Sequence, residues 1–77
     1  MVSQSKYLYK INLRSASDVF EFTRAAVKYN GDLNLVNGKH RLNAKSALGV
    51  ALARVSWDEI YLECEKDCYF DFERFIV

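Results

Sequence analysis

The dipeptide Asn37-Gly38 stands between two stretches in which apolar and polar side chains alternate, residues 32–36 and 39–43. An Asn-Gly pair in this setting is the strongest short-range signal for a β-hairpin, because tight hairpin turns need residues that accept a positive φ. An isolated hairpin is barely stable in water, so other strands and a covering layer must bury its apolar face. The rest of the chain therefore has to supply both.

Alternation predicts two more strands, at residues 6–13 and 60–65, and helical spacing predicts helices at residues 16–29, 45–55 and 68–76. Ser15 or Ser17 is expected to cap the first helix, Ser46 the second and Asp67 the third. The apolar stripes expected to face the core are Ala16, Val19, Phe20, Thr23, Ala26 and Val27; Leu48, Ala51, Leu52 and Val55; and Tyr69, Phe72, Phe75 and Ile76. The element order β-α-β-β-α-β-α predicts an α+β, two-layer open-faced sandwich: one domain over residues 1–77, with a four-stranded antiparallel sheet and helices on one face.

Composition and charge exclude several classes of function. With 11 basic and 10 acidic side chains there is no basic excess, so nucleic-acid binding is not expected. No apolar run approaches the roughly 20 residues of a membrane span, and the N-terminal stretch MVSQSKYLYK lacks a signal-peptide core. We therefore expect a cytoplasmic protein without membrane insertion.

Reactive groups are few. Cys64 and Cys68 lack the two further ligands that structural zinc needs, so we expect buried thiols, no metal and no cofactor. His40 is placed on the return strand of the hairpin, away from any base or anion site. No nucleophile–base–acid set is visible, and the chain is not expected to be an enzyme.

Aromatic residues leave two questions open. Tyr7, Tyr9 and Tyr61 are expected to share the open face of the sheet, where they either pack across strands or form a homodimer interface. The aromatic stretch at residues 70–75 is either fully buried or a surface for a partner.

Three segments carry a resemblance to a known family. They are KYNGDLNL at residues 28–35, NGK at residues 37–39 and NAKSALGV at residues 43–50. They resemble, in order, the end of the first helix with the second strand, the hairpin, and the regulatory-serine segment of the HPr family. HPr proteins are phosphocarriers of the bacterial sugar phosphotransferase system.

The resemblance fails at the position that carries phosphate. The family segment G-[IL]-H-A-R-P falls on residues 13–18, where only Ala16 is kept. Ser15 stands at the histidine position, Ser17 at the arginine position and Asp18 at the proline position. A serine phosphate is a monoester, among the slowest groups to hydrolyse, so Ser15 cannot relay phosphate as a histidine does. This argues against a true carrier.

The resemblance implies instead that Ser46 is the target of an HPr-type kinase, as in the histidine-less Crh-type relatives that take part in catabolite repression. The implied partners are that kinase, sugar phosphotransferase proteins or a transcription regulator. The implied partner or anion surface comprises Arg14, Ser15, Ser17, Ala47, Leu48 and Ala51. Two alternatives remain: an HPr-fold interaction module that is not phosphorylated, and a functional phosphocarrier. Ser15 and Ser46 also have a plain explanation as helix caps.

Overall fold

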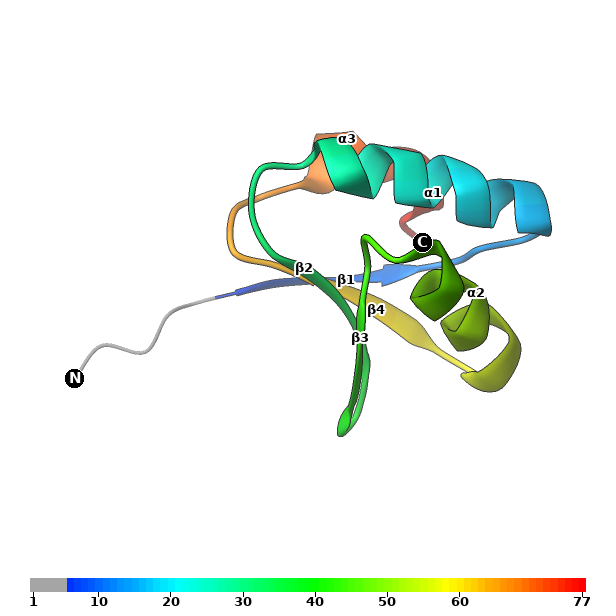
Figure 1. Ribbon diagram of the computed structural model, residues 1–77. Coiled ribbons are helices and arrows are strands. Elements are labelled where there is room, and N and C mark those ends of the chain that lie inside the picture. Colours follow the sequence, from blue (N-terminus) through cyan, green and yellow to red (C-terminus); the bar gives the residue numbers. More distant parts are fainter. Residues whose placement is uncertain (1–5) are drawn as a thin grey trace.

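The computed structural model describes residues 6–77 and contains a four-stranded antiparallel sheet with helices on one side (Figure 1). The strands are β1 (Tyr7–Ile11), β2 (Leu33–Asn37), β3 (His40–Asn43) and β4 (Ile60–Cys64), in the spatial order β1-β4-β2-β3. The helices are α1 (Ala16–Lys28), α2 (Ala47–Ser56) and α3 (Tyr69–Phe72), and a 3₁₀ turn, η1 (Glu73–Phe75), follows α3. The predicted α+β class, element order and antiparallel sheet are confirmed.

The hairpin between β2 and β3 forms at the predicted place. Asn37 pairs with His40, so the turn consists of Gly38 and Lys39. Gly38 has a φ of 60°, which a side chain with a Cβ adopts only at a cost. The Asn-Gly signal thus identified the turn, and the glycine takes its first central position.

Aromatic rings fill the layer between the sheet and the helices. Phe22 of α1 lies with its ring centroid 5.1 Å from that of Phe72 and 5.3 Å from that of Phe75. All three rings are almost completely buried, as are Leu35 and Leu62 from the two central strands. This cluster holds the C-terminal segment, α1 and the sheet together.

The predicted burial of Val19 and Ala26 in α1 is confirmed, but the rest of the buried face differs from the prediction in both long helices. α1 buries Val19, Phe22 and Ala26, while Phe20 and Val27 are 65% and 57% exposed. The predicted stripe included the two exposed residues and omitted Phe22. The rotation of α1 about its axis is set by the packing of the Phe22 ring against Phe72 and Phe75.

In α2 the buried residues are Val50 and Ala53. Of the predicted stripe, Leu48, Leu52 and Val55 are turned towards solvent, and Ala51 is half-buried. The helix is apolar on almost every side, so hydrophobic spacing does not distinguish its inner from its outer face. Both leucines of the helix are left outside, while Val50 and Ala53 face the core.

The third predicted helix, residues 68–76, is divided into a short α-helix and a 3₁₀ turn, and it ends before Ile76. α3 has four residues, and Ile76 beyond η1 forms an antiparallel bridge with Ile11. The Asn12 amide donates to the Phe75 carbonyl at 2.8 Å, and the Val77 amide donates to the Lys10 carbonyl at 3.0 Å. Pairing with the free edge of β1 satisfies backbone groups that a sheet edge otherwise leaves open.

The predicted tyrosine face is wrong. Tyr9 pairs with the buried Leu62, so Tyr7 and Tyr9 lie on the helix-covered side, and only Tyr61 lies on the open side. Tyr9 donates a hydrogen bond to Asp67 at 2.6 Å, and this bond raises the pKa of the Tyr9 hydroxyl. Successive residues of a strand point to opposite faces. The open face therefore carries no tyrosine cluster.

Residues 1–5, half of the N-terminal stretch expected to lack a signal peptide, lie outside the described part of the chain. Within residues 6–77, no helix is long and apolar enough to cross a bilayer.

Candidate interaction surface

The segment that aligns with the phosphocarrier histidine forms a helix cap. Ser15 is the N-cap of α1, and its Oγ accepts a hydrogen bond from the Asp18 amide at 3.4 Å. The Asp18 carboxylate in turn accepts from the Arg14 amide at 2.9 Å. The Ser15 hydroxyl thus satisfies one free amide at the start of α1, and the Asp18 carboxylate holds the residue that precedes the cap. The negative charge of Asp18 at the start of α1 opposes the binding of an anion. The arrangement therefore supports the explanation of Ser15 as a helix cap.

The side chains of the other two predicted residues in this segment take no part in these hydrogen bonds. Arg14 and Ser17 are exposed, and Ser17 lies within the first turn of α1. The backbone here is held by Arg54 of α2, which donates to the carbonyls of Leu13 and Arg14 at 3.1 and 3.2 Å. Arg54 thus joins the end of α2 to the start of α1.

Ser46 is the N-cap of α2. Its Oγ accepts from the Gly49 amide at 3.2 Å, and its own amide donates to the Asn43 carbonyl at 3.1 Å. A Cβ on Gly49 would lie 3.2 Å from the Asn43 carbonyl oxygen, which is tighter than ordinary contact. The glycine within this helix therefore permits a close backbone approach beside Ser46.

Ser46→Ala is expected to lower the free energy of unfolding by about 1 kcal/mol, because the Gly49 amide loses its acceptor. Ser46→Asn is expected to stay within about 0.5 kcal/mol of the wild type, since asparagine is an equally good N-cap. Urea unfolding followed by circular dichroism measures both variants. Equal stability of Ser46→Ala and wild type would contradict the cap assignment.

Apolar side chains line the outer face of α2 directly after Ser46. Leu48, Leu52 and Val55 are 81%, 50% and 74% exposed, although they lie on one stripe of the helix. Ala47 is also exposed, whereas Ala51 is half-buried and packs against the core. Of the predicted partner residues on α2, the structure therefore places Ala47 and Leu48 at the surface and turns Ala51 partly inward.

α1 packs beside α2 and adds Phe20 and Val27, two exposed residues seven positions apart and thus on one side of the helix. Glu21 lies on the other flank, where it forms an ion pair with Arg74 of η1. We call Phe20, Val27, Leu48, Leu52 and Val55 the α1/α2 apolar surface. Large exposed apolar patches on small proteins mark binding sites more often than chance.

His40 lies apart from both helix N-termini. It is exposed on β3, and its ring centroid is 6.3 Å from that of Trp57. Among residues 6–77 its side chain makes no hydrogen bond with an acid or a base. Nothing in this setting orients the imidazole for phosphoryl transfer.

Cys64 and Cys68 are both buried free thiols, as predicted, and burial raises the pKa of each above the ordinary thiol value. Within the described residues, no group of three or more His, Cys, Asp or Glu side chains is arranged to hold a metal ion.

Neither thiol is expected to react with a disulfide reagent near pH 8 in the folded protein, since attack requires the thiolate. Both are expected to react rapidly in denaturant. Colourimetric thiol counting with and without guanidinium measures this, and rapid labelling of the native protein would contradict the burial.

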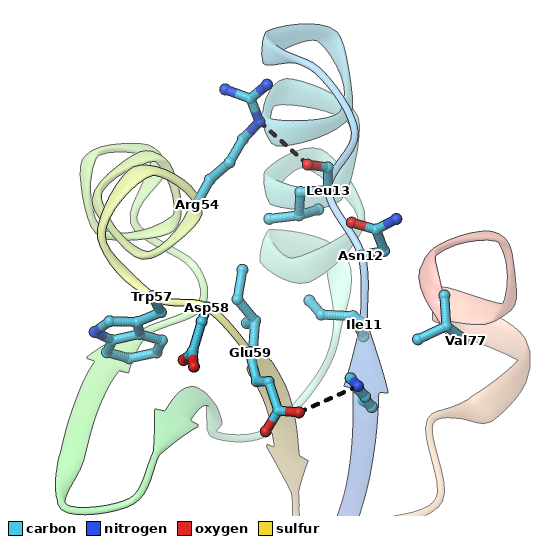
Figure 2. Close-up of a pocket in the computed structure, with 10 residues that line it drawn as sticks. Ile11, Asn12, Leu13, Arg54, Trp57, Asp58, Glu59 and Val77 are labelled. Carbon is cyan, nitrogen blue, oxygen red and sulfur yellow. Dashed lines mark hydrogen bonds and ion pairs between the residues drawn. The ribbon is translucent and has the colours of Figure 1, made fainter.

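A cavity of about 430 Å³ lies where β1 and β4 meet the end of α2 and the C-terminal residue (Figure 2). Its charged groups already have partners: Arg54 binds the Leu13 carbonyl, and Lys10 pairs with Glu59 at 3.3 Å. The Asp58 carboxylate accepts from the side-chain Nδ2 of Asn37 at 3.2 Å. The cavity is therefore a junction of internal contacts rather than an array of free catalytic groups.

No family model matches the sequence, and neither a curated protein nor a solved structure is significantly similar to it.

Four contributors to the surface escaped prediction because they were assigned to the core. Phe20 and Val27 belonged to the expected buried stripe of α1, as Leu52 and Val55 did to that of α2. One feature of the sequence could have indicated the exposed residues of α2. Apolar residues are distributed almost evenly around this helix, and one core-facing stripe cannot bury all of them.

Proposed function

We propose that this chain is a histidine-less, HPr-like regulatory protein that binds protein partners through the α1/α2 apolar surface and is switched by phosphorylation of Ser46. The resemblance of residues 28–55 to the HPr family supports the family assignment. The element order and the one-sided helical layer are what that resemblance implies.

One observation carries the proposal: an exposed apolar stripe begins two residues after the serine that resembles the family's regulatory site. Leu48 is 81% exposed and lies two residues from Ser46. Exposing such a side chain forgoes about 1.5–3 kcal/mol of burial free energy. A partner that covers the stripe recovers that free energy on binding.

Ser46 is well placed to act as a switch. A phosphate there carries about two negative charges and lies at the start of α2, where the helix dipole and free amides stabilise an anion. α2 has no acidic residue, so the modification changes the sign of charge at that end of the surface. It thereby favours a partner with basic groups opposite Ser46 and disfavours one with acidic groups there.

The alternative is an HPr-fold interaction module that binds through the same surface without phosphorylation. The exposure of Leu48 and Val55 supports this reading equally, since an apolar surface needs no phosphate to bind. A phosphocarrier role has less support: Ser15 is engaged as a cap, and His40 has no orienting group among residues 6–77.

Titration of ¹⁵N-labelled protein with a catalytically inactive HPr-type kinase tests the docking surface. We expect chemical-shift changes of backbone amides at residues 46–55 and around Phe20 and Val27. We expect none at Tyr69 and Phe70 in α3. The same titration with a non-cognate kinase is the control. Shifts confined to the open face of the sheet, or no shifts, would contradict the proposed surface.

A further inference from the structure

A shallow pocket of about 340 Å³ lies on the exposed side of α1 next to η1. It is lined by Glu21, Arg24, Ala25, Lys28 and Arg74. Arg24 and Lys28 are one helical turn apart, so their side chains project from the same face of α1. The small Ala25 leaves room beside them, and Arg74 approaches from η1.

Positive charge dominates this pocket. It combines three cationic side chains with one carboxylate, although the chain as a whole has a net charge of only +1. Within residues 6–77, neither Arg24 nor Lys28 takes part in a salt bridge. Both are exposed, so their charges are available to a ligand.

Arg74 is held in position from two sides. Glu21 forms an ion pair with one of its terminal nitrogens, and the guanidinium lies 5.1 Å from the centre of the Phe75 ring. Phe75 is itself buried, so the ring is a fixed support. A guanidinium has five donors in a planar fork, and donors not used by Glu21 remain for an anion.

We propose that Arg24, Lys28 and Arg74 form a binding site for a small phosphate-bearing anion with at least two negative charges, such as a diphosphate. Two guanidinium groups provide the forked donors that match phosphate oxygens, and the lysine adds a mobile point charge. A singly charged anion would leave net positive charge uncompensated in the pocket. The site is separate from Ser46, because α1 and η1 form it, whereas Ser46 caps α2.

Inorganic pyrophosphate is the probe. Titrating it into the ¹⁵N-labelled protein at low ionic strength is expected to give saturable amide shifts at residues 21–28 and 74. Added sodium chloride is expected to weaken binding, since the charges are exposed and salt screens them. Orthophosphate at the same concentration is expected to bind more weakly, because it carries less charge.

Arg24→Gln combined with Lys28→Gln is expected to weaken pyrophosphate binding about tenfold while leaving the circular dichroism spectrum unchanged. Lys39→Gln is the matched control, since Lys39 is an exposed lysine in the β2–β3 turn, and it should leave the Kd unchanged. If Lys39→Gln weakened pyrophosphate binding equally, the effect would come from net charge alone, and the proposed site would be wrong. Shifts centred on Ser15 or Ser46, or the absence of saturable shifts, would also overturn the site.

Discussion

Replacing Phe72 by alanine is expected to remove most of the protein's free energy of unfolding. The ring is completely buried and packs against Phe22 and Tyr29, at centroid distances of 5.1 and 6.5 Å. Removing a buried phenylalanine costs about 3–5 kcal/mol. Native domains are stable by only about 5–15 kcal/mol, and small domains lie at the low end. Urea unfolding measures the loss.

Phe70→Ala is the matched control, because Phe70 lies two residues away and is 85% exposed. Its expected effect is within about 0.5 kcal/mol, which is typical of surface substitutions. The pair answers the question that the aromatic C-terminal sequence left open: Phe72 and Phe75 serve the core, while Phe70 faces solvent. Similar losses in the two variants would mean that α3 is packed differently.

Leu48→Asp is expected to slow phosphorylation of Ser46 by an HPr-type kinase roughly 100-fold in kcat/KM, a loss of about 2.7 kcal/mol. Losses of this size are typical when a central apolar contact of an interface is truncated or charged. Leu48 is 81% exposed, so the free energy of unfolding is expected to change little. Initial rates at several substrate concentrations give the measurement.

Phe70→Asp provides the control for charge, since it places the same carboxylate on an equally exposed apolar position at α3. Its phosphorylation rate is expected to equal that of the wild type. A normal rate for Leu48→Asp would show that the kinase does not use this stripe. Equal slowing of both variants would point to overall charge instead.

The sequence predicted most of the fold because its local signals agreed with one another. The Asn37-Gly38 turn, the Ser15 and Ser46 caps and the alternating strands all lie within a few residues of their predicted places. Each is a short-range effect, set by turn geometry or by the need to satisfy helix amides.

The phases of the helices were not predictable in the same way, because they depend on contacts between distant segments. α1 turns so that Phe22 meets Phe72 and Phe75, which are 50 or more positions later in the chain. In α2, Val50 and Ala53 face inward although Leu48 and Leu52 are larger and more apolar. The spacing fits either phase, and packing volume decides between them.

Contacts between distant segments also explain why the last predicted helix ends early and why the three tyrosines do not share a face. Ile76 leaves the expected helix because the edge of β1 offers it backbone partners. Tyr61 pairs with Lys10, and Tyr9 pairs with Leu62. This register between β1 and β4 decides which tyrosines share a face, and it cannot be obtained from the sequence of either strand alone. For the site, the cap positions were predictable, whereas the exposure of Leu52 and Val55 required the phase of α2.

Intact-mass measurement after incubation with ATP and an HPr-type kinase tests the central claim most directly. The wild-type protein is expected to gain one acid-stable phosphate, and fragmentation should place it on Ser46. Ser46→Asn keeps the helix cap but has no hydroxyl to modify, so it should gain none. A wild-type mass that stays unchanged, or a phosphate that persists in Ser46→Asn, would contradict regulation at Ser46.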